Sequence, residues 1–206
     1  MQADVFALKT LAGATVRDGT RYSFEGLTVV PINTDPNILG FIYLSLRKDR
    51  RLSYLFHESV PDLDVFLSKF KNIPVLGCFG VDQNVCGIGY AHPIQEVPLE
   101  DSGRCLRKSE VGMAFMHGAR RTVDFGFLML LWAFEQLELD VVYGCTPVLN
   151  SAAVAYRERL GFDLIGRAPC YTAFEGKMCD AILSAITYSS FKDRINAEPP
   201  ILEGGE

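Results

Sequence analysis

The sequence predicts a single α/β (α+β) domain in which helices flank a central mixed sheet. Along the 206 residues, segments with the alternating or continuous apolar pattern of strands are interspersed with segments whose apolar residues have the spacing of a helix. Two apolar runs flank Asp82–Asn84, which indicates a hairpin. The run from Asp140 to Cys145 is typical of a strand buried on both faces. No internal repeat is visible, so one domain is the simplest organisation.

Composition and charge narrow the classes of function. The formal net charge is −5, and hydrophobic residues make up 49% of the chain against 22% charged residues. An acidic chain of this kind argues against a general nucleic-acid binder, which usually carries a basic stripe. The short basic cluster at 46–51 is interpreted first as a solvated helix face. The composition therefore favours an ordinary globular protein.

Cysteine usage and the amino terminus indicate a reduced, cytoplasmic protein. The six cysteines form no C-x-x-C pair and the three histidines lie far apart, so no metal site is expected. Residues 1–19 lack a basic start followed by an apolar core, which argues against a signal peptide. The longest apolar run, 125–134, is too short to span a bilayer and predicts a buried helix. No membrane association is expected.

The amino-terminal part is predicted to hold a strand and two helices. Residues 1–20 are expected to be an appendage with a short helix, ahead of a strand at 21–32. Asp35 before Pro36 predicts an N-cap followed by a favourable first helical residue. Apolar residues on one stripe predict a second helix at 61–70.

The rest of the chain predicts strands alternating with helices. The expected elements are a polar loop at 98–109, a strand at 110–115, a helix ending near 137, a strand at 140–145, a helix at 151–160 and a strand at 163–168. The chain is then predicted to fold back at Glu175–Lys177. Residues 193–206 are expected to be a disordered tail, which leaves 21–192 as the domain.

The segment from Tyr143 to Phe162 has the signals of a capped helix. The Asn150 amide oxygen is expected to accept the backbone N–H of Ala152 or Ala153. Gly161 supplies a left-handed stop, after which Phe162 folds back on the last turn. These signals fix a helix but not a function.

The combination of these signals resembles a known family. Asn-x-x-Ala from Asn150, followed by Gly161-Phe162 and a strand, resembles the last motif of the GNAT N-acetyltransferases. The strand, loop and helix at 110–134 resemble the family's preceding motif, and the final hairpin resembles the branch that acetylates protein N-termini and related amines. The resemblance covers about 21–192. It implies the GNAT fold with a mostly antiparallel sheet, acetyl-CoA as cosubstrate, and neither a metal nor a covalent intermediate.

The phosphate-binding loop departs from the family pattern. The family's loop usually reads Q/R-x-x-G-x-G/A, whereas Asp124 stands here where the first glycine belongs. An aspartate in the first helical turn suits the helix dipole but competes with a phosphate for the same N–H groups. Gly118, Arg120 and Arg121 are expected to compensate by moving the anion site earlier in the loop. The cofactor-binding residues that the resemblance implies are Phe115, Met116, Gly118, Arg120, Arg121, Thr122, Gly126 and Asn150.

Acetyl transfer to an amine needs an acceptor for its proton and help for the departing thiolate. Glu110 opens the strand before the loop, where histone acetyltransferases of the same superfamily keep a glutamate base. His92 and His117 are rival bases, because the histidine pKa lies near about 6.5. Tyr156 is the candidate proton donor to the thiolate. The family usually has its tyrosine seven residues after the asparagine, however, and Arg157 holds that position here.

Two functions follow from the resemblance. The first is an acyl-CoA-dependent N-acyltransferase that moves acetyl directly to a primary amine, on a small molecule or a polypeptide, in a ternary complex. The second is a non-catalytic protein on the same fold with a structural, assembly or ligand-binding role, because fold alone does not determine function. Asp124 favours the second function, and the loop arginines with Asn150 favour the first. A homodimer is a further expectation, whereas the acceptor amine carries no readable motif.

Overall fold

The computed structural model describes residues 15–17, 21–32, 35–56, 60–100 and 103–196. The strands are β1 (Thr15–Arg17), β2 (Arg21–Phe24), β3 (Leu27–Pro31), β4 (Val75–Phe79), β5 (Val85–Ala91), β6 (Gln95–Pro98), β7 (Cys105–Phe115), β8 (Val141–Pro147), β9 (Asp163–Phe174) and β10 (Lys177–Thr187). The helices are α2 (Pro36–Lys48), α3 (Leu63–Phe70), α4 (Thr122–Gln136), α5 (Ser151–Leu160) and α6 (Tyr188–Asn196), with a 3-10 turn η1 (Leu52–Tyr54).

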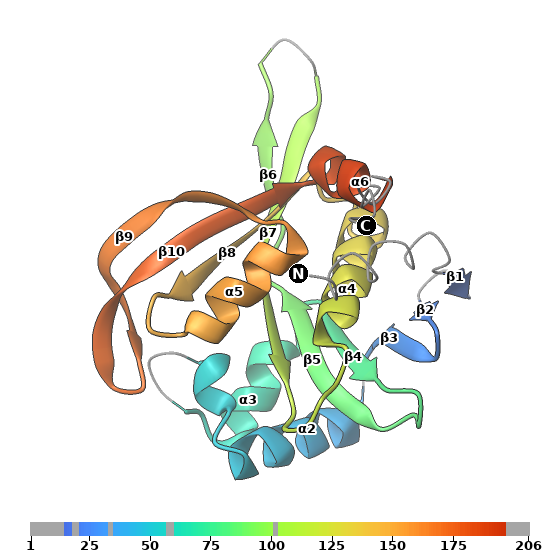
Figure 1. Cartoon of the computed structure of the whole chain (residues 1–206), viewed down its shortest axis with the longest axis vertical. Helices are drawn as coiled ribbons and strands as arrows, with labels where there is room; N and C mark the ends of the chain where they lie inside the picture. Colours follow the sequence, from blue (N-terminus) through green and yellow to red (C-terminus); the bar gives the residue numbers. More distant parts are fainter. Residues whose placement is uncertain (1–14, 18–20, 33–34, 57–59, 101–102, 197–206) are drawn as a thin grey trace, which may run out of the picture.

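The strands form one mixed sheet in the order β1-β2-β3-β4-β5-β7-β8-β10-β9, and β6 pairs with β7 outside this path. The pairing of β7 with β8 is parallel, and the other described strand pairs are antiparallel. Figure 1 shows the β6–β7 hairpin and the long β9–β10 hairpin projecting from the body of the molecule. The mostly antiparallel mixed sheet that the resemblance implies is therefore confirmed.

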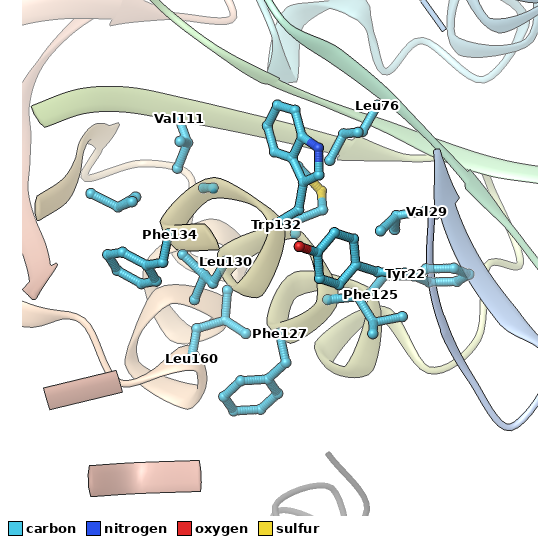
Figure 2. Close-up of a cluster of buried hydrophobic side chains, with 14 of the residues drawn as sticks. Tyr22, Val29, Leu76, Val111, Phe125, Phe127, Leu130, Trp132, Phe134 and Leu160 are labelled. Carbon is cyan, nitrogen blue, oxygen red and sulfur yellow. The ribbon is translucent and has the colours of Figure 1, made fainter. Parts of the chain in front are cut away.

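Two clusters of buried side chains cover the sheet. The larger cluster surrounds α4, where almost every residue from Phe125 to Phe134 is buried (Figure 2), so the predicted buried helix is confirmed. The smaller cluster joins α2 and α3 to Ile88 of β5 and Ala114 of β7. Val111 of β7 belongs to the larger cluster and Ala114 to the smaller, so β7 has a hydrophobic core on each of its faces.

The helix ends follow the local signals of the sequence. The Asp35 carboxylate accepts the N–H groups of Asn37 at 2.9 Å and Ile38 at 3.2 Å, so α2 begins as predicted. The Asn150 side chain accepts the Ala153 N–H at 3.2 Å. Gly161 has a φ of +88° at the end of α5, where an L side chain is disfavoured. The strand-loop-helix arrangement around the motif is thus present.

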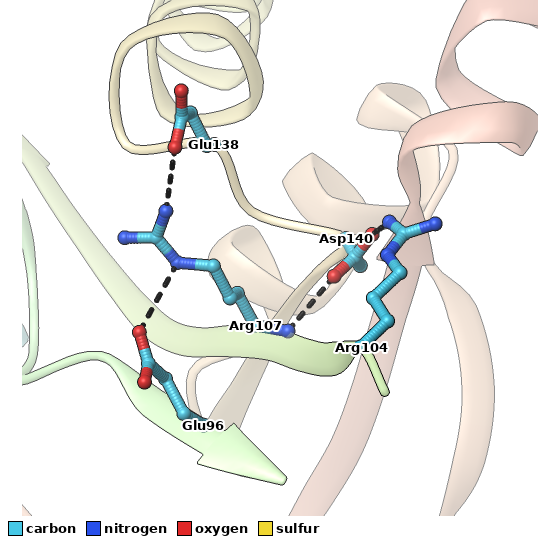
Figure 3. A network of polar contacts seen from close by, with 5 residues as sticks. All are labelled: Glu96, Arg104, Arg107, Glu138 and Asp140. Atoms are coloured by element: carbon cyan, nitrogen blue, oxygen red, sulfur yellow. Dashed lines mark hydrogen bonds and ion pairs between the residues drawn. The ribbon is translucent and has the colours of Figure 1, made fainter. Parts of the chain in front are cut away.

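The predicted polar loop at 98–109 is wrong in its second half, because residues 105–109 belong to β7 and the first four of them pair with β6. Ion pairs and a hydrogen bond join this hairpin to the segment between α4 and β8 (Figure 3). Arg107 pairs with Glu138 at 2.7 Å, its N–H donates to Asp140 at 2.8 Å, and Asp140 also pairs with Arg104. These partners lie 31 to 36 residues away, which is why the local pattern did not reveal the strand.

Two other expectations need correction. The strand predicted at 21–32 is a hairpin, because Glu25 and Gly26 both have positive φ and reverse the chain between β2 and β3. The predicted tail begins inside α6, which buries Phe191 in the larger cluster. Residues 1–14 and 197–206 lie outside the described residues. None of the helices described is long and apolar enough to cross a membrane.

Candidate active site between two diverging strands

The site lies where β7 and β8 separate. Their parallel pairing covers only three residue pairs and ends at Glu110 opposite Tyr143. Beyond that point β7 remains paired with β5 as far as Phe115, while β8 remains paired with β10 as far as Pro147. The two strands therefore diverge beyond Glu110.

The divergence leaves a row of β7 backbone groups facing the gap. The Glu110 carbonyl accepts from His92 N at 2.8 Å and Met116 N donates to the Cys86 carbonyl at 2.8 Å, so the even-numbered residues bond toward β5. Backbone groups alternate along an antiparallel ladder. The N–H and C=O groups of Val111, Met113 and Phe115 therefore point to the other side, toward β8.

Arginine side chains occupy both ends of this row. Arg157 Nη2 donates to the Val111 carbonyl at 3.5 Å, and Arg51 Nη1 donates to the Phe115 carbonyl at 3.0 Å. Met113 lies between them, where the amide N–H and C=O of an extended ligand have room to pair with the strand. A row of strand groups open to solvent is a natural template for such pairing.

Two adjoining cavities follow the gap. A groove of about 240 Å³ is lined by Arg51, Met113–Phe115, Thr122 and the start of α5. A smaller cavity of about 90 Å³ lies deeper, and Glu110, Cys145, Arg157, Tyr90 and His92 line it. Tyr156 and Asn150 line both cavities, so the groove leads to the group of titratable side chains.

Glu110 is the carboxylate in this lining. Its Oε1 atom accepts the backbone N–H of Cys145 at 3.3 Å, across the gap between the strands. The pKa of Tyr90 is raised to about 12, mainly by burial and to a smaller extent by the charge of Glu110. The pKa values of Cys145 and Tyr143 are raised by the same two causes in the same order. The field of Glu110 therefore extends over the groups around the cavity.

Arg157 brings a buried positive charge into the same cavity. Its Nη1 donates to Ser184 Oγ at 3.3 Å, and its guanidinium lies 5.4 Å from the ring centre of Phe162. Gly144 makes this position accessible, because any Cβ there would overlap the guanidinium. Burial lowers the pKa of Arg157, and Glu110 is the first of the charges that oppose the shift. With both charges present, the cavity is close to neutral.

Tyr156 lies one residue before Arg157 and points differently. Its hydroxyl donates to the Thr122 carbonyl at 2.7 Å and lies 3.5 Å from the sulfur of Met113. Burial raises the pKa of Tyr156 well above its usual value. A side chain on Gly126 would collide with this hydroxyl, which explains the glycine in the second turn of α4. The proton expected for the thiolate is thus already engaged in a hydrogen bond.

At the start of α4, ion pairs of Arg121 occupy the place where a phosphate would bind. Arg121, the N-cap, has a φ of +56° and pairs with Asp124 at 2.6 Å and Glu25 at 3.1 Å. Its guanidinium also lies 5.3 Å from the ring centre of Phe24. Two carboxylates therefore neutralise the arginine expected to bind phosphate. Asp124 turns toward Arg121, and this ion pair offsets the repulsion that the sequence predicts.

The other candidate residues lie around the loop. His117 is exposed, and its backbone N–H donates to Asp49 at 3.1 Å. His117, Gly118 and Arg120 line a separate cavity of about 750 Å³ against the β4–β5 turn. His92 lies instead beside Glu110, with its ring 5.5 Å from that of Tyr90. The structure thus separates the two rival histidines.

Sequence reasoning missed Tyr90 and Arg51 and did not give Arg157 a role. Tyr90 and Arg51 lie at the site because they contact β7, Tyr90 by strand pairing and Arg51 by a hydrogen bond. No local sequence pattern predicts these contacts. Arg157 did have a signal, because it stands at the seventh position after Asn150. Among the described residues, no group of three or more His, Cys, Asp or Glu side chains is placed to hold a metal ion.

Tyr90 makes stability sensitive to alkaline pH. Its pKa of about 12 in the folded chain exceeds the usual value of 10.0, so the unfolded chain loses this proton first. Stability should therefore fall as pH rises from about 10 toward 12. We expect Tyr90→Phe to show a shallower fall in melting temperature between pH 9 and 11 than the wild type. Exposed Tyr171→Phe serves as the control, and equal slopes for wild type and Tyr90→Phe would contradict the assignment.

No protein-family model and no curated protein sequence matches the chain. Solved structures do match it. The spermidine N-acetyltransferase from Vibrio cholerae in complex with CoA and spermine has a TM-score of 0.67 and 20% identity, over 81% of this chain and 98% of that one. The ribosomal-protein-S5-alanine acetyltransferase from Vibrio fischeri has a TM-score of 0.59 and 15% identity, over 84% and 98%. A GNAT-family acetyltransferase from Bacillus anthracis has a TM-score of 0.62 and 11% identity, over 82% and 98%. The chain therefore has the fold of the GNAT acetyltransferases.

Proposed function

We propose that the protein is an acyl-CoA-dependent N-acyltransferase that moves acetyl from acetyl-CoA to a primary amine in a ternary complex. The observation that carries the proposal is the position of Glu110. It lies at the point where β7 and β8 separate, and it lines the cavity of about 90 Å³ that adjoins the open strand edge. The similar V. cholerae enzyme forms a complex with CoA and spermine, which supports a donor thiol and an amine as ligands of the proposed site. The reaction is placed in the cytoplasm.

The residues present fit the thiol arm of acetyl-CoA. That arm carries two amides in an extended chain, which suits the backbone groups of Met113 between the two arginines. The groove of about 240 Å³ beside Thr122 and Ala152 gives it room. The carbonyl end would then point toward the deeper cavity with Glu110 and Arg157. The Phe115 N–H faces the same gap and continues as a backbone partner of the arm, as the resemblance implies. The Met116 N–H does not serve in this way, because it already donates to the Cys86 carbonyl at 2.8 Å.

Glu110 takes the role of proton acceptor in this proposal. A primary amine arrives protonated near neutral pH and must lose a proton before its nitrogen attacks the thioester carbon. The Glu110 carboxylate accepts that proton directly or through one water. The new N–C bond forms as the C–S bond breaks, and the C–S electron pair leaves with the sulfur as a thiolate. The proton that the nitrogen still carries after the attack passes to this thiolate, directly or through water. His92, next to the same cavity, is the second candidate for this role.

Arg157 is our candidate for stabilising the departing thiolate. Its guanidinium carries a fixed charge and extra donors in a buried cavity, where electrostatic stabilisation is strong. Tyr156 must give up its 2.7 Å bond to the Thr122 carbonyl before it can protonate the sulfur. We therefore assign Tyr156 a supporting role, in which it fixes the first turn of α4 against α5.

One observation favours the second function, a non-catalytic protein on the same fold. The ion pairs of Arg121 with Asp124 and Glu25 close the helix start where a pyrophosphate would bind. In a protein that does not bind acyl-CoA, these ion pairs would not interfere with function. The proposal of an enzyme requires that the phosphates bind elsewhere or that the pairs open.

The base assignment is tested by Glu110→Gln in a thiol-release assay with acetyl-CoA and a panel of primary amines. General-base removal typically lowers the rate by about 10²- to 10⁴-fold, and we expect kcat to fall in this range while CoA affinity stays within about threefold. Glu158→Gln on the exposed face of α5 is the matched control. His117→Ala, remote from the cavity, should turn over normally.

Each other outcome of this assay has a defined meaning. Normal turnover by Glu110→Gln together with a loss in His92→Ala would move the base to His92. Absence of CoA binding and of thiol release in the wild type would favour the non-catalytic function instead.

Comparing the kcat and the stability of an Arg157 variant with those of a Tyr156 variant distinguishes the proposed roles of the two residues. Arg157→Met should lower kcat by about 10²- to 10³-fold, the usual effect of removing one transition-state donor. Tyr156→Phe should lower kcat by less than about tenfold but destabilise the fold by about 1–3 kcal/mol, because it leaves the Thr122 carbonyl without its partner. Urea unfolding and steady-state rates measure both effects, with exposed Arg159→Met as the control. A large kcat loss in Tyr156→Phe with unchanged Arg157→Met would restore tyrosine as the acid.

A further inference from the structure

A cluster of basic side chains lies at the carboxyl-terminal end of α2. It comprises Arg47, Lys48, Arg50 and Arg51, with Asp49 as the one carboxylate among them, and is called the α2 basic cluster below. Arg47, Lys48 and Arg50 are exposed. Among the residues that the structure describes, none of the four cations forms an ion pair. Their charge is therefore available to a ligand.

The α2 basic cluster is held against the end of β7. Arg51 Nη1 donates to the carbonyls of Phe115 at 3.0 Å and Met116 at 3.5 Å. Asp49 accepts the His117 N–H at 3.1 Å. Figure 1 shows α2 at the end of the sheet where β7 leads into the loop before α4. The cluster is thus fixed at the outer mouth of the groove.

Arg51 is suited to bind an anion from this position. Its two described bonds to carbonyls use Nη1, which leaves Nη2 and Nε as further donors. A guanidinium binds phosphate through such paired donors. Arg51 also lines the groove of about 240 Å³ opposite Thr122 and Ala152. A ligand lying along β7 with its thiol end near Glu110 would bring its other end to this arginine.

The loop before α4 offers fewer free charges than the α2 basic cluster, because exposed Arg120 forms none of the described ion pairs but Arg121 is paired. Arg121 is neutralised by Asp124 and Glu25, so the start of α4 is a poor site for a phosphate. The anionic end of a donor entering the groove therefore meets favourable potential on the α2 side. The electrostatic potential around the groove therefore favours binding of the phosphate near α2.

We propose that the α2 basic cluster binds the phosphate end of the donor thiol and takes the place of the closed loop at α4. This inference rests on the proposed function, since it assumes a phosphopantetheine-type thiol in the groove. The shared chemistry is a phosphate attached to the pantetheine arm. It occurs both in CoA and in the phosphopantetheine group of a carrier protein.

Calorimetric titration of four thiols tests the proposal: CoA, dephospho-CoA, 4′-phosphopantetheine and pantetheine. Changing both Arg50 and Arg51 to Met should weaken CoA by about 10- to 100-fold, in line with the loss of charged hydrogen bonds. It should weaken pantetheine much less, by the share that Arg51 contributes as part of the groove lining. A second variant replaces only the exposed Arg47, Lys48 and Arg50 by Gln, which avoids the bonds of Arg51 to β7. It should also weaken CoA and flatten its salt dependence. Arg167→Met on β9 is the matched control.

The ligand series identifies the source of the phosphate. Equal effects on CoA and 4′-phosphopantetheine place the cluster at the phosphate that both share, whereas an effect confined to CoA places it at the nucleotide phosphates. Either result supports the proposal. Unchanged CoA affinity in both cluster variants, with a loss in Arg121→Met, would overturn it and leave the proposed function intact. Failure of the wild type to bind CoA or 4′-phosphopantetheine would overturn both.

Discussion

Three parallel residue pairs between β7 and β8 determine the architecture of the site. The pairing ends at Glu110 because β7 continues along β5 and β8 continues along β10, so each strand has an antiparallel partner on its far side. Asp140 holds the closed end of the gap through Arg104 and the Arg107 N–H (Figure 3). The open end is bounded by α5 and α2. Both cavities are consequences of this one divergence.

A buried pair of opposite charges shapes the chemistry within the gap. Glu110 and Arg157 line the same cavity, and each acts on the pKa of the groups around it. An amine with several positive charges would meet the guanidinium as well as the carboxylate. Under the proposed function, a near-neutral cavity would therefore suit a single amino group better than a string of them.

The parts of the fold predicted correctly are those with local signals. Asp35 and Asn150 cap their helices through N–H groups two or three residues away, and Gly161 ends α5 through its own φ. Such contacts depend on neighbouring residues, so spacing reveals them. The extension of β7 and the pairing of β6 depend instead on Arg107 and Asp140, which are distant in sequence.

The site was predictable to a smaller extent, for the same reason. Glu110 was proposed because the sequence predicts a strand that begins there before a recognisable loop. The strand begins at Cys105 instead, and Glu110 lies where the pairing with β8 ends. Tyr156 and Arg157 are adjacent on α5, and one residue turns a helical side chain by about 100°. Tyr156 therefore bonds to the Thr122 carbonyl, whereas Arg157 bonds to Ser184 and the Val111 carbonyl. The closure of α4 by Glu25 and the contact of Arg51 with Phe115 join segments far apart in the chain. Rules based on the spacing of nearby residues cannot predict such contacts.

Residue-resolved amide hydrogen exchange with and without saturating CoA tests the central claim, that the β7 edge in the gap receives the thiol arm. The Met113 N–H faces the gap, whereas the neighbouring Gly112 bonds toward β5 and provides an internal control. We expect CoA to slow exchange at Met113 by tenfold or more, on the order of the protection that one added hydrogen bond gives, and to leave Gly112 nearly unchanged. Protection elsewhere on the molecule with no change at Met113 would contradict the account.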